Sequence, residues 1–298
     1  MCNACMYIGV RMQTMAALSR PLVLTYCNKF KDTNHENTRR LVETMKANDW
    51  DHAVLGGGET WVNYMTKMTA YRRHLETLPP DTIVVIADAH DVYCLRNAHY
   101  FVDEFRALNK PIVLSMELFA EGRINYNPNQ VYVQVEWLGP YFEHHGMRIG
   151  PNDGIKKYVN SGLMCGYARN LLHLINWTFE QGHTDDQKAA AAYANAHPDD
   201  VHLDMDARLL HTCTSAVNFG LHAQAQCDDS PSFGELFGHS AYFLHIPGLQ
   251  CGGGQLMLYN VVYDVLQRYN PRIAAELPSY NYNYVAFKHY HENEKKIK

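Results

Sequence analysis

Short apolar runs alternate with amphipathic segments along the first 117 residues of the chain. The apolar runs span residues 21–27, 52–58, 82–88 and 111–117, and hydrophobic residues recur at helical spacing over 37–48, 60–78 and 101–109. The third apolar run is continuous in its hydrophobicity, which is typical of a strand that is buried on both faces. Strands that alternate with helices in this way predict a parallel α/β sheet covered by helices.

The pattern is less regular after residue 117. Residues 118–158 are rich in aromatic, polar and turn-forming side chains, and we expect a loop-rich insertion there. Residues 158–182 predict a strand, a glycine break and a helix, residues 183–197 an alanine-rich helix with an acidic start, and residues 241–248 a strand. The chain shows no internal repeat and no linker, so a single domain is the simplest interpretation.

Composition and charge narrow the class of protein. The 298 residues are 47% hydrophobic with a formal net charge of −5, and the only dense basic stretch is the terminal EKKIK, so we expect no nucleic-acid partner. No apolar run reaches the length of a membrane helix, and the N-terminus lacks the apolar core of a signal peptide. We therefore expect a soluble, intracellular protein.

The eight cysteines form no recognisable metal or disulfide pattern. Only Cys2 and Cys5 have the CxxC spacing, and no second pair accompanies them, so we expect no zinc site there. Cys27, Cys94 and Cys165 lie in or beside apolar runs, where a free cysteine behaves as a small hydrophobic residue. Free thiols favour a reducing compartment.

Two carboxylates stand together at the end of the third predicted strand, in the sequence IADAHDVYCL at residues 86–95. Ligands of such sheets bind beyond the carboxyl ends of the strands, where Asp88, the glycine run at 56–58 and Glu117 are expected to lie. Neighbouring carboxylates repel each other unless a cation lies between them, and the DxxD spacing of Asp88 and Asp91 suits Mg²⁺ or Mn²⁺ held jointly with a phosphate. The alternative is a helix or turn cap with a solvent-exposed partner.

His245 ends a different predicted strand and offers a third ligand. An imidazole would shift the preference from Mg²⁺ toward Mn²⁺, although a purely structural histidine is the alternative. His202 and Asp204 form an HxD pair, two thirds of an iron-binding facial triad, but the all-β pattern of such oxygenases is missing. Two further alternatives stay open: a metal-dependent phosphohydrolase that uses Asp88, Asp91 and water, and a non-catalytic protein that binds sugar nucleotides.

Six motifs resemble, in the same order, the glycosyltransferase domain of the procollagen lysyl hydroxylases. They are VLGGG (54–58), VVIADAHDVYCL (84–95), YVNSGLMCGYARN (158–170), DDQ (185–187), LDMDARLLHT (203–212) and FLHIPG (243–248). The resemblance covers about residues 21–258 and implies a GT-A fold, a Rossmann-like nucleotide-sugar domain whose central sheet is mostly parallel. We expect residues 1–20 to form a poorly defined leader and residues 259–298 a helical or irregular extension.

The resemblance also implies roles for individual residues. Asp88, Asp91 and His245 would ligate Mn²⁺ or Mg²⁺, His90 stands where the family has a tyrosine against the uracil ring, and Thr25 lies where the first strand meets the nucleotide. Gly57, Gly58 and Gly248 belong to the motifs expected at the nucleotide. Asn160, Asp185 and Asp186 would face the donor sugar and the acceptor.

The alternatives and departures concern the same positions. Three glycines form a tight turn more often than a phosphate loop, and acidic residues in a first helical turn complement the helix dipole without any ligand. The family has a lysine near its histidine, whereas HIPGLQCGGGQ (245–255) has none, and the amides of residues 252–254 are the alternative phosphate contact. Lys67 lies later, on the helix, and we do not assign it a catalytic role.

The resemblance implies a hexosyltransferase that uses a UDP-sugar donor. The expected reaction moves glucose, or alternatively galactose, to a hydroxyl of a collagen-like, hydroxylysine-linked acceptor or another glycan, as in the glucosylation of procollagen galactosylhydroxylysine. The sequence does not indicate the oligomeric state.

Overall fold

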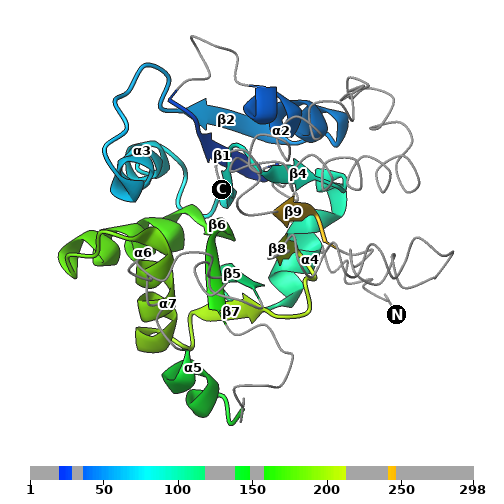
Figure 1. Cartoon of the computed structure of the whole chain (residues 1–298). Coiled ribbons are helices and arrows are strands. Elements are labelled where there is room, and N and C mark those ends of the chain that lie inside the picture. The colour runs from blue at the N-terminus through cyan, green and yellow to red at the C-terminus, as the bar shows by residue number, and fades with distance from the viewer. Residues whose placement is uncertain (1–19, 29–35, 118–137, 148–157, 213–240, 246–298) are drawn as a thin grey trace, which may run out of the picture.

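The computed structural model describes residues 20–28, 36–117, 138–147, 158–212 and 241–245 (Figure 1). The expectations for residues 1–19, Cys2 and Cys5, Gly248, residues 252–254 and the C-terminal extension therefore lie outside the described residues. Of the loop-rich insertion expected at 118–158, the structure describes residues 138–147 and the strand start at 158, and it places a short helix at Gly139–His144. None of the helices in the described part of the chain is long and apolar enough to span a membrane.

A six-stranded sheet forms the centre of the fold, in the order β2-β1-β3-β6-β5-β7. The strands are β1 (Leu22–Tyr26), β2 (Asp51–Leu55), β3 (Ile83–Asp88), β5 (Ile112–Glu117), β6 (Tyr158–Tyr167) and β7 (Val201–Asp204). All of them run in one direction except β6, which pairs antiparallel with both β3 and β5. The predicted α/β class with a mostly parallel sheet is confirmed.

A smaller sheet joins three short strands in the order β4-β9-β8. They are β4 (Val92–Cys94), β8 (Leu210–Thr212) and β9 (Phe243–His245), and the periodicity of the sequence did not predict β4 or β8. In this sheet Val92 pairs with His245, so the end of β9 lies beside the turn that follows β3. The small sheet thus brings a distant part of the chain to the end of the central strand.

Helices cover both faces of the central sheet (Figure 1). They are α2 (Glu36–Ala47), α3 (Tyr64–Leu75), α4 (Phe101–Ala107), α5 (Gly139–His144), α6 (Ala168–Glu180) and α7 (Asp186–Ala196), with a 3₁₀ turn at Ala98–Tyr100. The glycine break expected after residue 158 is absent, because β6 runs through Gly162 and Gly166 and α6 follows it directly.

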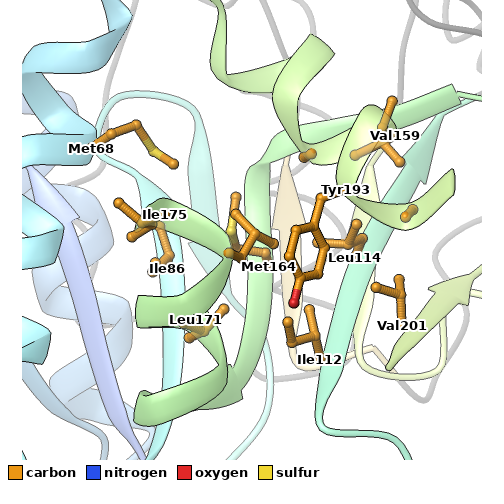
Figure 2. Packing of buried hydrophobic residues seen from close by; sticks show 14 of the residues in the cluster. Met68, Ile86, Ile112, Leu114, Val159, Met164, Leu171, Ile175, Tyr193 and Val201 are labelled. Atoms are coloured by element: carbon orange, nitrogen blue, oxygen red, sulfur yellow. The ribbon is translucent and has the colours of Figure 1, made fainter. Parts of the chain in front are cut away.

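Two hydrophobic cores explain why the strand at 83–88 is apolar throughout. Val84 and Ile86 pack on one face with α3, α6 and α7, as Figure 2 shows for Met68, Ile175 and Tyr193. The alternate residues of the same strand point to the other face and pack with α2 and α4. Each fully buried side chain of this size stabilises the fold by about 1.5–3 kcal/mol. The two cores hold the end of β3 rigidly.

Candidate functional site

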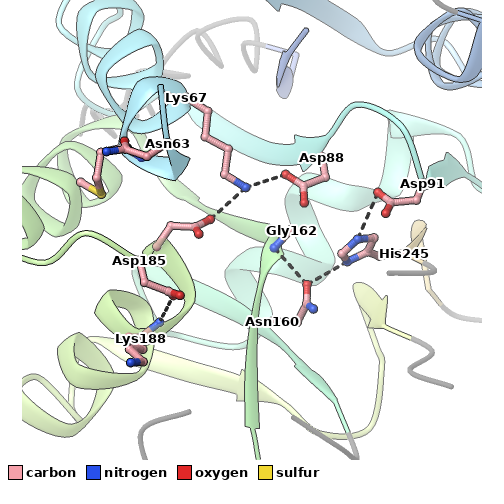
Figure 3. Close-up of polar contacts among 11 residues, drawn as sticks. Asn63, Lys67, Asp88, Asp91, Asn160, Gly162, Asp185, Lys188 and His245 are labelled. Atoms are coloured by element: carbon pink, nitrogen blue, oxygen red, sulfur yellow. Dashed lines mark hydrogen bonds and ion pairs between the residues drawn. The ribbon is translucent and has the colours of Figure 1, made fainter. Parts of the chain in front are cut away.

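Asp88, Asp91 and His245 lie together beyond the end of β3 (Figure 3). Their ligand atoms are all within 4.8 Å of one another, and within the described ranges no other group of three such residues is this compact. His245 Nε2 lies 3.2 Å from Asp91 Oδ1, and both side chains are buried. The Asp88 side chain is the more open of the three, with 33% of its surface exposed.

The two sheets explain this placement. Asp88 is the last residue of β3, and Asp91 follows in the turn before β4. The pairing of β4 with β9 puts His245 opposite Val92, next to Asp91. His245, a residue of the small sheet, therefore joins the two carboxylates at the end of β3 as a third candidate ligand.

The three side chains fit a divalent cation. Two carboxylates and one imidazole are a donor set suited to Mn²⁺, and the negative charge of the carboxylates favours binding. Gly162 of β6 leaves the space that this set needs, since a Cβ atom there would lie 2.2 Å from His245 Cε1 and 2.8 Å from Asp88 Oδ2. The absence of a side chain at residue 162 is thus matched to the ligand group.

Replacing Gly162 with alanine should weaken metal-dependent activity by about 10²-fold, the size of effect that a displacement of about 1 Å in a site produces. The added methyl group would push against His245 and Asp88, and the backbone has little room to withdraw because Leu163 pairs with β3 and Asn160 pairs with β5. Initial rates over a range of Mn²⁺ concentrations measure the effect. Gly146→Ala serves as the control: its Cβ would meet no atom within 4 Å, and the strain of its φ of +67° should lower stability but leave the Mn²⁺ dependence unchanged. Wild-type metal dependence in Gly162→Ala would contradict the assignment of the ligands.

A buried lysine connects the metal group to a second part of the site (Figure 3). Lys67 Nζ lies 2.8 Å from Asp88 Oδ1 and 2.9 Å from Asp186 Oδ2. It stands in the first turn of α3, which begins after Asn63 because the Asn63 side chain accepts a hydrogen bond from Met65 N. The structure thus places Lys67, to which the sequence assigned no role, between two carboxylates from distant elements.

The charges of Lys67, Asp88 and Asp186 stabilise one another. Burial alone would lower the pKa of Lys67, but the carboxylates of Asp186 and Asp88 outweigh it and hold that pKa well above its usual value. Burial would raise the pKa of Asp88, but Lys67 and then His245 outweigh it, so the pKa of Asp88 is lowered. The net effect favours the ionised form of Asp88, which is the form that ligates a metal.

The two consecutive aspartates at the start of α7 have different surroundings. Asp185 is the N-cap of the helix, and its Oδ1 accepts a hydrogen bond from Lys188 N at 2.9 Å. This contact corresponds to the cap that the sequence left open as an alternative. Asp186 is buried and faces Lys67. Of the pair, Asp186 is therefore the residue that the fold ties to Asp88.

Asn160 of β6 contacts His245 directly. Its Oδ1 lies 2.8 Å from His245 Nδ1 and accepts a hydrogen bond from Gly162 N at 2.9 Å. Its Nδ2 donates to Glu117 Oε2 at 3.0 Å, and Gln187 Nε2 donates to Glu117 Oε1 at 2.8 Å. Burial alone would lower the pKa of His245, but Asp91 outweighs it and the pKa is raised. Polar side chains of three elements thus meet around one imidazole.

The expected nucleotide contacts lie beside the same strand ends. Thr25 pairs with Ala87, and its Oγ1 is buried without a hydrogen-bond partner among the described residues. His90 Nε2 lies 3.5 Å from Cys27 Sγ, which closes the end of β1. These residues lie next to Asp88 along or across the strands, as a nucleotide bound at the strand ends requires.

The glycine run after β2 forms a tight turn. Gly56 has φ +86°, and a Cβ atom there would lie 2.2 Å from the ring of Tyr26. Gly58 has φ +80°, and its amide donates to Asn28 O at 3.1 Å. The left-handed conformation and the close approach both require glycine. Gly57 and Gly58 were the two glycines expected at the nucleotide. The amide of Gly58 is already bonded to Asn28 O, so the amide of Gly57 is the remaining candidate for a nucleotide contact.

Comparison with known proteins places the chain in a family. A family model described as the PLOD GT domain matches residues 21–222. Among solved structures, a glycosyltransferase involved in the glycosylation of the major capsid of PBCV-1 is 11% identical, with a TM-score of 0.42, over 80% of this chain and 96% of that chain. The 4-diphosphocytidyl-2C-methyl-D-erythritol synthase from Anaerococcus prevotii is 9% identical, with a TM-score of 0.35, over 62% of this chain and 88% of that chain. No curated protein matches.

The family match extends over more than half of the chain and includes β1 to β8, with Asp88, Asp91, Asn160 and Asp186. The chain therefore belongs to the PLOD glycosyltransferase domain family.

Proposed function

We propose that this domain is a metal-dependent hexosyltransferase that moves glucose from UDP-glucose to a hydroxyl of a collagen-like, hydroxylysine-linked acceptor or another glycan. The observation that carries the proposal is the group of Asp88, Asp91 and His245 at the ends of the parallel strands, in a chain of this glycosyltransferase family. UDP-galactose is the alternative donor.

The donor side of the reaction uses the residues around β1 and β3. Asp88, Asp91 and His245 would hold Mn²⁺, which when bound supplies positive charge to the diphosphate that leaves. Thr25 Oγ1 offers an unused buried hydroxyl, and His90 offers a flat ring to the uridine. Lys67 adds a fixed positive charge beside Asp88 and so favours an anionic leaving group.

The acceptor side lies at the start of α7. Asp186 is held by Lys67, and Asp185 caps the helix, but a carboxylate has about four lone-pair positions and keeps accepting capacity beyond one or two contacts. Either residue can therefore orient an acceptor hydroxyl. Trp61 and Tyr64, which precede Lys67 and are exposed, pack edge to face at 5.9 Å and offer an aromatic surface to a sugar ring.

The nucleotide product distinguishes a transferase from a phosphohydrolase. A panel of UDP-sugars with Mn²⁺ should show UDP release that rises with a hydroxyl acceptor, because a transferase site excludes water from the sugar. UMP with sugar phosphate as the main products would instead identify a phosphohydrolase. Binding of UDP-sugar without turnover under any acceptor would identify a non-catalytic binding protein. Chromatographic separation of UDP and UMP decides among these outcomes.

A further inference from the structure

The amide of Asn160 can face only one way. Its Oδ1 lies 2.9 Å from Gly162 N, and a backbone N–H can only donate. Its Nδ2 lies 3.0 Å from Glu117 Oε2, which accepts as a carboxylate. Turning the amide over would place donor against donor and acceptor against acceptor at 2.9 and 3.0 Å. Two independent contacts therefore fix the direction of the carbonyl oxygen.

The orientation of Asn160 decides which nitrogen of His245 carries a proton. His245 Nδ1 lies 2.8 Å from Asn160 Oδ1, which can only accept, so Nδ1 must donate. The other ring nitrogen, Nε2, points to Asp91 Oδ1 at 3.2 Å (Figure 3). A histidine ligates a metal through a nitrogen without a proton, and a hydrogen bond at the other nitrogen selects which one that is.

The contacts extend from His245 to the start of α7. Gln187 Nε2 donates to Glu117 Oε1 at 2.8 Å, and Glu117 in turn accepts from Asn160. Glu117, Asn160 and His245 are all buried, with exposed fractions of 0%, 4% and 2%. Water therefore has little access to replace a lost contact. Because these groups are hydrogen-bonded one to the next, the donor and acceptor roles of one residue determine those of the next.

We propose that Asn160 is a positioning residue: locked by Gly162 and Glu117, its amide oxygen holds His245 with the proton on Nδ1 and presents Nε2 to a divalent cation beside Asp88 and Asp91. This inference rests on the proposed function, because it concerns a ligand of the metal site. It differs from a direct contact of Asn160 with the donor sugar. The amide oxygen already accepts two hydrogen bonds and one amide hydrogen is used, so a single N–H remains for a sugar.

Two variants at residue 160 separate the roles. Asn160→Leu removes the acceptor for His245 Nδ1 and should weaken Mn²⁺ binding by about 10–100-fold, the usual cost of losing a partner of a ligating histidine. In the double variant Asn160→Asp/Glu117→Gln, one carboxylate oxygen of residue 160 still accepts from His245 and Gly162. The amide of residue 117 then donates to the other carboxylate oxygen of residue 160. The double variant should bind Mn²⁺ about as tightly as the wild type. The measurement is calorimetric titration with Mn²⁺ alone, without nucleotide sugar.

A matched variant controls for general damage. Asn48 is also buried, and its Nδ2 donates to the carbonyls of Thr44 and Cys94 rather than to the metal group. Asn48→Leu should lower the melting temperature and leave Mn²⁺ affinity unchanged. If Asn160→Leu does not fold, Asn160→Asp alone should be less stable than the double variant, because it sets one carboxylate against another.

Nitrogen NMR of metal-free, ¹⁵N-histidine-labelled protein tests the inference without any metal. At a pH where the ring is neutral, the His245 signal, identified by its loss in His245→Gln, should show the proton on Nδ1 and not on Nε2 in the wild type, and a loss of this preference in Asn160→Leu. An unprotonated Nδ1 in the wild type, or unchanged Mn²⁺ affinity in Asn160→Leu, would overturn the positioning role. A wild-type protein that binds no Mn²⁺ would instead overturn the proposed metal site, and the NMR result would still decide the role of Asn160.

Discussion

Replacing Asp91 with asparagine should lower the rate of metal-dependent hexosyl transfer by more than about 10²-fold, because a metal ion contributes several kcal/mol to such a transition state and each ~1.4 kcal/mol is a factor of ten. Asp91 is buried and faces His245 Nε2 at 3.2 Å. Asparagine keeps the size of the side chain and removes its charge, so the loss reports on the cation and not on packing. Initial rates and UDP-sugar binding, each over a range of Mn²⁺ concentrations, measure it.

Asp204→Asn is the matched control for this variant. Asp204 is also buried, but its carboxylate accepts hydrogen bonds from the backbone N–H groups of Arg208, Leu209 and Leu210, all at 2.8 Å. Its replacement should lower the free energy of unfolding and leave the Mn²⁺ dependence as in the wild type. Turnover of Asp91→Asn close to that of the wild type would show that the cation is held elsewhere or is not needed.

Local pattern was sufficient to predict the frame of the site. A strand buried on both faces must be apolar along its length, so the change from Ala87 to Asp88 marks its end. The parallel direction of β3 and β5 then puts Asp88 and Glu117 at one edge of the sheet. Periodicity was enough to predict the strand ends because each strand or helix was inferred from residues that are neighbours in the sequence.

Pairing between distant segments was beyond local pattern. Nothing in the run 158–167 distinguishes an antiparallel strand between β3 and β5 from a parallel strand at the edge of the sheet. Likewise, the approach of His245 to Asp91 depends on the pairing of β4 with β9, two strands of three residues each. Such short strands are stabilised by what packs on them and leave little trace in the sequence. The apolar run at 241–248 offered His245 as a third ligand and the family resemblance assigned it as one, but neither showed which strand would bring it to Asp91.

Lys67 was left without a role for a related reason. Its helix buries Met65, Met68 and Tyr71 on one face, and Lys67 lies on that face too. A lysine among buried positions is a signal, because a buried lysine is almost always paired. The sequence could not name its partners, since Asp88 and Asp186 come from other elements. The sequence also did not fix which of Asp185 and Asp186 caps α7 and which lies in its first turn.

Replacing Lys67 with methionine should lower the free energy of unfolding by about 3–5 kcal/mol, the cost of removing one partner from a buried ion pair. Asp88 and Asp186, which contact Lys67 Nζ at 2.8 and 2.9 Å, would then face each other without a cation between them. Urea unfolding without metal measures the loss. Lys110→Met is the control, because Lys110 is partly exposed at the surface and its Nζ donates to Asp199 O, and it should change stability by less than about 0.5 kcal/mol.

The pH dependence of stability follows from the same contacts. The pKa of Asp88 is lowered in the fold, so its contribution is present above about pH 4, the ordinary value of a free aspartate, and is lost as the pH falls further. The pKa of Lys67 is raised, so its contribution is present below about pH 10 and is lost at higher pH. Lys67 is the main group that lowers the pKa of Asp88, so Lys67→Met lacks most of this contribution at neutral pH. Its stability should therefore fall less than that of the wild type when the pH drops below about 4.

A second substitution shows whether repulsion between carboxylates causes the loss in Lys67→Met. Adding Asp186→Asn removes one of the two charges, so the double variant Lys67→Met/Asp186→Asn should recover part of the stability, even though it carries one more change. Mn²⁺ should also stabilise Lys67→Met more than it stabilises the wild type, because a cation at Asp88 would replace the missing positive charge. The contradicting outcome is additivity: the double variant would then be less stable than Lys67→Met by as much as Asp186→Asn alone destabilises the wild type. That result would show that Lys67 contributes through packing and not through its charge.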